Sequence, residues 1–237
     1  MYLGNNSNGG VKAAYGTGER EGLSDFFRDI FTWMLFGLAI TGVIAELVSS
    51  DKPMVIFLST HVLLFYILIG LQLAAVLGLS FGINKLPAVM SETIFVLYAA
   101  LTGVTFSTIF LIYTSQSIGL VFFLTAFSFG LLAFIGYTTK KDLTSMGNFM
   151  FVGLIAIIVA MFVNFFLHSS ALMYIISVLG VIIFLGLTAY DMQKLKQIYL
   201  SGSFDERKET VMGALTLYLD FINLFLMLLN LFGQQRD

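Results

Sequence analysis

Cysteine is absent from this sequence, and proline, histidine and charged residues are scarce. Without cysteine the chain forms no disulfide and offers no thiolate nucleophile or cysteine metal ligand. Cysteine usage therefore does not indicate whether the protein lies in an oxidising or a reducing compartment. The two histidines, His61 and His168, lie far apart in the sequence, which disfavours a structural zinc site. No basic run and no basic patch with interleaved aromatic residues indicates a nucleic acid as partner. Several common classes of functional site are thereby excluded.

Apolar residues are abundant instead. They make up 58% of the 237 residues, and charged residues make up 11%. A soluble domain has about 45–50% apolar and about 25% charged residues. A single soluble core of this length cannot bury so much apolar surface, whereas a bilayer accepts it because the bilayer is itself an apolar solvent. We therefore expect an integral membrane protein whose first partner is the lipid bilayer.

The apolar residues are grouped into long runs that follow a polar start. Residues 1–25 are rich in Gly, Asn, Ser and charge and lack the apolar segment of a signal peptide, so we predict a flexible tail. Each later run has a length near the ~20 residues that cross a bilayer as a helix, and none shows the alternation of a lipid-facing strand. The seven runs cover about 26–48, 55–79, 91–113, 118–136, 148–166, 172–189 and 211–232. We predict one all-α domain over residues 26–237 with seven transmembrane helices.

The distribution of lysine and arginine predicts the orientation. If the N-terminus is cytoplasmic, ten of these residues fall on the cytoplasmic side, and two, Lys52 and Arg236, fall outside. This asymmetry follows the positive-inside rule. We therefore expect a multi-pass protein of the cytoplasmic membrane, with a cytoplasmic tail over residues 1–25 and the C-terminus outside.

Two aspartates are the candidates for function, because an ionisable side chain deep in a bilayer costs about 2.5–3.5 kcal/mol on insertion scales and is functional by default. Asp220 has no basic residue within ten positions, and Asp191 closes the sixth run just before Lys194 and Lys196. The sixth and seventh runs are neighbours joined by a cytoplasmic loop, so both aspartates should lie in the cytoplasmic half of the protein. We expect the two lysines to extend outward to the membrane surface.

Helical spacing gives the aspartates polar neighbours. Thr188 shares a face with Asp191, and Thr216 and Asn223 share one with Asp220. If these faces meet, the two carboxylates cannot both ionise cheaply and should titrate as a unit. Such a pair is a natural pH sensor and a hard-oxygen site for a cation such as calcium. The alternative is a hydrogen-bonded pair that only holds two helices together.

These residues lie in a pattern that resembles the Bax inhibitor family, the transmembrane Bax-inhibitor-motif proteins, and within it the bacterial YbhL/YccA-like inner-membrane branch. The matching segments are GLTAYDMQKLK at 186–196, GALTLYLDFINLFLMLL at 213–229, GYTTKKDL at 136–143 and LYAALTG at 97–103. The resemblance extends over residues 25–235. It implies a bacterial inner-membrane protein in which the last helix is central and surrounded by the other six.

The resemblance also implies a function. Members of this family are associated with a pH-sensitive calcium leak in which two aspartates are the sensor, and these correspond to Asp191 and Asp220. An arginine in related proteins holds the first aspartate, and the matching position here is Lys85, which lacks the bidentate fork of arginine. Where those proteins carry a glutamate in the second helix, this chain has Ala74, with Gln72 nearby.

Three functions are compatible with this reading. The first is a pH-sensitive cation leak, with calcium as the transported or bound ion and no other cofactor. The second is a regulatory protein that binds partners such as a membrane quality-control protease. The third is an intramembrane aspartyl protease, but such enzymes need a Gly-x-Gly-Asp motif and a Pro-Ala-Leu motif. Here Leu217-Tyr218-Leu219 precedes Asp220, and no proline follows Pro87. We therefore expect that the chain is not an enzyme.

Overall fold

The protein is an all-α membrane protein, as predicted. The computed structural model describes residues 8–83, 85–202 and 205–236, and it has nine helical segments in these ranges. They are α1 (Asn8–Ser50), α2 (Lys52–Thr60), α3 (Val62–Gly82), α4 (Ala88–Phe106), α5 (Ile109–Ile112), α6 (Ser115–Thr138), α7 (Thr144–Leu167), α8 (Ser170–Ser201) and α9 (Glu206–Phe232). Among the described residues, seven helical stretches are long and apolar enough to cross a membrane, which agrees with the seven predicted runs.

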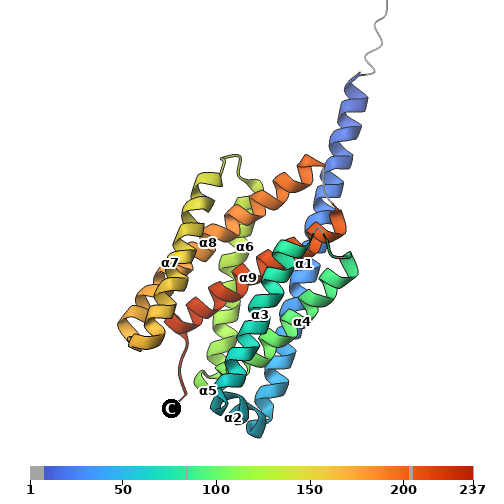
Figure 1. The fold of residues 1–237 in the computed structure, drawn as a ribbon. Coiled ribbons are helices and arrows are strands. Elements are labelled where there is room, and N and C mark those ends of the chain that lie inside the picture. Colours follow the sequence, from blue (N-terminus) through green and yellow to red (C-terminus); the bar gives the residue numbers. More distant parts are fainter. Residues whose placement is uncertain (1–7, 84, 203–204, 237) are drawn as a thin grey trace, which may run out of the picture.

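The long helices run up and down, so the bundle has two ends (Figure 1). We call the end with residues 139–143, where α8 ends and α9 begins, the amino-terminal side, because α1 begins there. The carboxy-terminal side holds α2, α5 and the chain end. Residues 8–20 of α1 extend beyond the other helices on the amino-terminal side (Figure 1).

Helix α9 is the centre of the bundle. It packs against α1, α4, α6 and α8, whereas α3 packs mainly on α4 and α7 mainly on α8. In the most apolar stretch of α9, 72% of the residues are buried, against 6% in α3 and 6% in α7. Figure 1 shows α9 crossing the bundle obliquely between these two outer helices. The expected central position of the last helix is confirmed.

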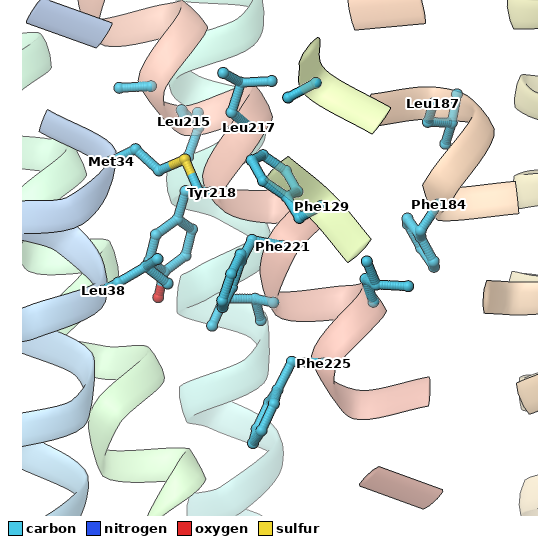
Figure 2. Close-up of a cluster of buried hydrophobic side chains, with 14 of the residues drawn as sticks. Met34, Leu38, Phe129, Phe184, Leu187, Leu215, Leu217, Tyr218, Phe221 and Phe225 are labelled. Carbon is cyan, nitrogen blue, oxygen red and sulfur yellow. The ribbon is translucent and has the colours of Figure 1, made fainter. Parts of the chain in front are cut away.

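Large side chains of α9 anchor it to its neighbours (Figure 2). Phe221 packs edge-to-face on Phe129 of α6, with ring centroids 5.5 Å apart. The fully buried Tyr218 points toward α1, where its hydroxyl lies 2.6 Å from Oγ1 of Thr41. Oγ1 of Thr41 also lies 2.9 Å from the carbonyl oxygen of Ala99 in α4. One buried polar junction therefore links α1, α4 and α9, and it fixes the helix that carries Asp220.

Close helix packing in lipid depends on small residues. A Cβ atom on Gly136 of α6 would lie 2.1 Å from the carbonyl oxygen of Ala189 in α8. A Cβ atom on Gly103 of α4 would lie 2.7 Å from the carbonyl oxygen of Thr41 in α1. At both positions the neighbour is backbone, which cannot rotate away as a side chain can. These two glycines let the helices around α9 approach closely.

Several boundaries differ from the prediction. The run at 55–79 is two helices, α2 and α3, which meet at an exposed His61 whose Nδ1 lies 2.8 Å from the carbonyl oxygen of Phe57. The sixth helix continues past residue 189 to Ser201, because the segment 190–201 contains good helix formers and Gly202, with φ +66°, ends it.

Residues 8–25 of the predicted flexible tail are helical and continuous with α1, while residues 1–7 lie outside the described residues. Pro53 is the first proline in the chain, so nothing interrupts α1 before Ser50.

Candidate functional site

The faces of α8 and α9 that carry the two aspartates meet. A Cβ atom on Gly180 of α8 would lie 2.7 Å from Cγ of Met227 in α9, so the two helices are in close contact there. Toward the amino-terminal side the facing residues become polar. The carboxyl groups of Asp191 and Asp220 interact there across the interface between the two helices.

The two aspartates differ in their surroundings. Asp220 lies near the middle of α9 and is 5% exposed, and its Oδ2 is buried without a hydrogen-bond partner among the described residues. Asp191 is less buried and lies about one helical turn from Lys194. A buried carboxylate oxygen without a partner is costly, so it marks a place where a cation or a proton donor is needed.

Both carboxyl groups line one cavity of about 870 Å³. Its walls come from α3, α4, α7, α8 and α9, and at the carboxy-terminal side α3 and α7 meet through Tyr66 and Phe165, whose ring centroids are 6.0 Å apart. The polar lining residues are Gln72, Ser80, Tyr98, Asn148, Tyr190, Asp191, Lys194, Thr216, Asp220 and Asn223. The lining nearer the carboxy-terminal side is apolar and includes Ile157, Met161, Phe184 and Met227. The polar lining residues therefore lie between the amino-terminal side and the middle of the cavity, together with apolar ones such as Phe151 and Met212, and the lining beyond them is apolar.

The predicted supporting residues fall into two groups. Thr216 and Asn223 line the cavity with Asp220, as their spacing predicted. The side-chain amide of Asn223 donates a hydrogen bond of 2.8 Å to the carbonyl oxygen of Leu219. Thr188 does not reach the cavity: it is fully buried, and its hydroxyl donates to the carbonyl oxygen of Phe184 at 2.7 Å. Its hydroxyl hydrogen is used by its own helix, so the structure shows no hydrogen bond from Thr188 to Asp191.

Lys194, and not Lys85, is the lysine that lies beside Asp191. Lys85 lies exposed in the turn between α3 and α4 and does not line the cavity. Lys194, expected at the membrane surface, lines the cavity and interacts electrostatically with Asp191. Its Nζ lies 6.0 Å from the ring centroid of Tyr190. The spacing of three residues between Asp191 and Lys194 is a signal for this pairing on one helix.

Gln72 marks the wall formed by α3. Its side-chain amide donates a 3.1 Å hydrogen bond to Oγ1 of Thr105 in α4, and the residue lines the cavity. Ala74, at the position where related proteins were expected to carry a glutamate, does not line it. The α3 wall of the cavity therefore contributes no carboxylate.

The donor set suits a weakly held hard cation. Within the described residues, no group of three or more His, Cys, Asp and Glu side chains could hold a metal ion. Two carboxylates with threonine and amide oxygens nearby leave most of a calcium coordination shell to water, because calcium takes six to eight oxygen ligands. A cation at these two carboxylates would therefore be bound weakly and released readily.

Comparison with known proteins identifies relatives over nearly the whole chain. A family model described as inhibitor of apoptosis-promoting Bax1 matches residues 23–237. The chain is 47% identical over 221 residues to the inner membrane protein YbhL of Escherichia coli strain K12, covering 92% of this chain and 94% of that protein. It is 42% identical over 214 residues to an uncharacterised protein of Deinococcus radiodurans, covering 90% and 91%. It is 41% identical over 215 residues to one of Borreliella burgdorferi, covering 90% and 93%. The matched segments include both α8 and α9.

Proposed function

We propose that this chain, which belongs to the Bax inhibitor family, is a pH-sensitive cation leak channel whose cation is calcium and whose site is the pair Asp191 and Asp220. One observation carries the proposal: among the described residues, a buried carboxylate oxygen of Asp220 has no hydrogen-bond partner, and Asp220 lines a large cavity together with Asp191. A charge at this depth in a bilayer is retained for function more often than for packing.

The pH response follows from the chemistry of the pair. Ionised carboxylates attract a cation, and protonation removes that attraction, so we expect acidification to weaken cation binding. The two groups interact and should titrate as a unit. The other titratable groups that line cavities with them are Lys194 and Tyr190 from α8, Tyr98 from α4 and Glu209 from α9. The aspartates are the groups expected to change their protonation state in this response.

The expected ion path enters from the amino-terminal side, where the cavity is polar. The apolar residues at the carboxy-terminal side, including Phe184 and Met227, then form the barrier of a closed state. A hydrophobic constriction blocks ions because it does not hold water. Conduction requires this barrier to open, and a weakly bound cation can leave once it does.

The location and orientation belong to the same proposal. We place the protein in a bacterial cytoplasmic membrane, with its amino-terminal side in the cytoplasm. Most lysines and arginines of the bundle lie on that side, including Lys140 and Lys141 in the turn after α6 and those at the start of α9, while Lys52 and Arg236 lie on the other. The positive-inside rule assigns the basic side to the cytoplasm.

A second candidate function rests on the first helix. The helical segment 8–20 extends α1 beyond the bundle, where a partner outside the membrane could reach it (Figure 1). In this alternative the chain regulates a partner such as a membrane quality-control protease. Removing residues 8–20 would then abolish partner binding and leave calcium flux unchanged. We propose no catalytic role for the aspartates in either case.

Calcium flux in proteoliposomes between about pH 5 and pH 8 tests the leak. We expect wild-type flux to depend on pH and Asp220→Asn and Asp191→Asn to alter both its size and its pH dependence. Glu46→Gln is the matched control, because it removes an exposed carboxylate outside the cavity. Wild-type flux no greater than that of empty liposomes at every pH would contradict the proposal and favour the regulatory alternative.

A further inference from the structure

A second, smaller cavity lies beside the first, between α8 and α9. It has a volume of about 130 Å³ and is nearer the amino-terminal side. Its lining includes Asp191, Lys194, Glu209 and Thr216. Three of these residues, Asp191, Lys194 and Thr216, also line the large cavity. The two cavities therefore adjoin, and the lining of the small one extends from Glu209, near the start of α9, to Asp191.

Lys194 stands where the cavities adjoin. Its ammonium group interacts electrostatically with Asp191 on its own helix and with Glu209 on α9. Among the described residues, no ion pair within 4 Å holds it to either carboxylate. The side chain of Lys194 is flexible, both Asp191 and Glu209 attract it, and neither holds it in a salt bridge. It is therefore free to shift between the two carboxylates.

The neighbouring basic side chains are placed differently. Lys196 donates a hydrogen bond of 2.9 Å to the carbonyl oxygen of Tyr137 in α6, and Lys208 lies 3.8 Å from a carboxylate oxygen of Asp205. Both are held away from the aspartate pair. Lys194 is thus the basic residue that shares both cavities with Asp191.

We propose that Lys194 is a built-in counter-cation that competes with the transported ion for Asp191. It partly satisfies the negative charge of the pair when no ion is bound. An ion arriving through the small cavity displaces the ammonium group toward Glu209, which receives it. This inference rests on the proposed function of the aspartate pair and adds to it the residue that sets selectivity.

Selectivity follows from the competition of charges. A divalent ion gains about twice the attraction of a monovalent ion at the same distance from the carboxylates, so it displaces the ammonium more readily. Sodium or potassium carries the same single charge as Lys194 and has no such advantage. The competition therefore favours calcium over monovalent ions.

The test compares Lys194→Met with Lys194→Arg and with Lys141→Met, which removes a charge on the same side of the protein but outside both cavities. We expect Lys194→Met to lower the calcium concentration at half-maximal flux on the order of tenfold, since one unscreened charge is removed. Its sodium flux should rise more than its calcium flux. Lys194→Arg should keep wild-type selectivity, and Lys141→Met should match the wild type.

A second readout separates this inference from the leak itself. Calcium-dependent stabilisation of the detergent-solubilised protein is measured by thermal unfolding, with the calcium-free midpoint as the control for folding. If the wild type shows no flux but calcium stabilises Lys194→Met at lower concentration than wild type, the leak is contradicted and the competition stands. If Lys194→Met equals the wild type in flux, selectivity and stabilisation, the competition is overturned. If calcium has no effect on either protein in either assay, both proposals are overturned.

Discussion

Helices α7 and α9 are both apolar enough to cross a membrane, yet they occupy opposite environments. In α7, 6% of the most apolar stretch is buried by protein, and large side chains such as Phe162 and Phe149 are more than half exposed. In α9, 72% is buried, and this helix carries Tyr218, Asp220 and Asn223 among its apolar residues. The less uniformly apolar helix is the one in the centre.

The difference shows what the apolar content of a helix indicates about its surroundings in a membrane protein. A lipid-facing residue needs to be apolar because it contacts hydrocarbon, whereas a residue between helices needs only partners that satisfy it. Polar residues inside a predicted span therefore indicate a helix surrounded by protein. Apolar length predicts that a helix crosses the bilayer, and embedded polar residues predict which helix is central.

Truncation of one large side chain in each helix tests this comparison with the largest expected effect. Leu224→Ala in α9 removes a fully buried side chain, so we expect a loss of about 2–5 kcal/mol in the free energy of unfolding. Phe162→Ala in α7 removes a side chain that is 66% exposed and should change stability by no more than about 0.5 kcal/mol. Thermal unfolding in detergent, followed by the fluorescence of the single tryptophan, Trp33, measures both. Equal losses in the two variants would contradict the assignment of α9 as the centre.

Two glycines of α6 sharpen the comparison within one helix. A Cβ atom on Gly136 would meet backbone of α8 at 2.1 Å, whereas a Cβ atom on Gly119 would meet nothing within 4 Å. We expect Gly136→Ala to cost about 1–3 kcal/mol through forced separation of the helices. Gly119→Ala should be neutral or slightly stabilising, because alanine favours the helix over glycine. The same unfolding assay measures the pair, and a neutral Gly136→Ala would show that α6 and α8 pack less closely than described.

The smallest expected effect lies outside the membrane, at the start of α7. Hydrogen bonds from the hydroxyl and the backbone N–H of Thr144, at 2.6 and 2.9 Å, hold the pKa of Asp142 below its ordinary value. The lowered pKa means that the carboxylate stabilises the folded state above about pH 4 and that this contribution is lost as the pH falls further. Asp142→Asn should therefore lower the thermal midpoint slightly at neutral pH.

The check on this prediction is a pH series of midpoints for wild type and Asp142→Asn. The difference between the two proteins should shrink as the pH falls below about 4, because the wild-type carboxylate is then protonated. A difference that stays constant with pH would mean that charge at this position does not support the start of α7.

Much of the fold could be predicted from the sequence, because long apolar runs have few alternatives in a bilayer. All seven crossing stretches were found, but their ends were not. The run that contains His61 shows no proline or glycine at that point, so nothing in it predicted the break between α2 and α3. The extension of α8 to Ser201 was missed because polarity was taken as the end of the helix, although helix-forming residues continue to Gly202.

The candidate site was predicted in part for a similar reason. Depth in the bilayer selected Asp191 and Asp220, and the structure brings them together in one cavity. The direction of Lys194 was missed, because a lysine near a helix end can extend to the surface or turn inward. Its spacing from Asp191 favours the inward direction, and Glu209 on the neighbouring helix, which shares the small cavity, adds a second acid on that side. Contacts between helices are the part that a single sequence does not specify.

The most direct test of the central claim is the protonation state of the aspartate pair when calcium is added. Infrared difference spectroscopy of the reconstituted protein follows the protonated carboxyl band at mildly acidic pH in wild type, Asp220→Asn and the control Glu46→Gln. The account predicts that calcium reduces this band in wild type and Glu46→Gln and leaves it unchanged in Asp220→Asn, because the cation and the proton share one site. A calcium response in Asp220→Asn equal to that of wild type would contradict it.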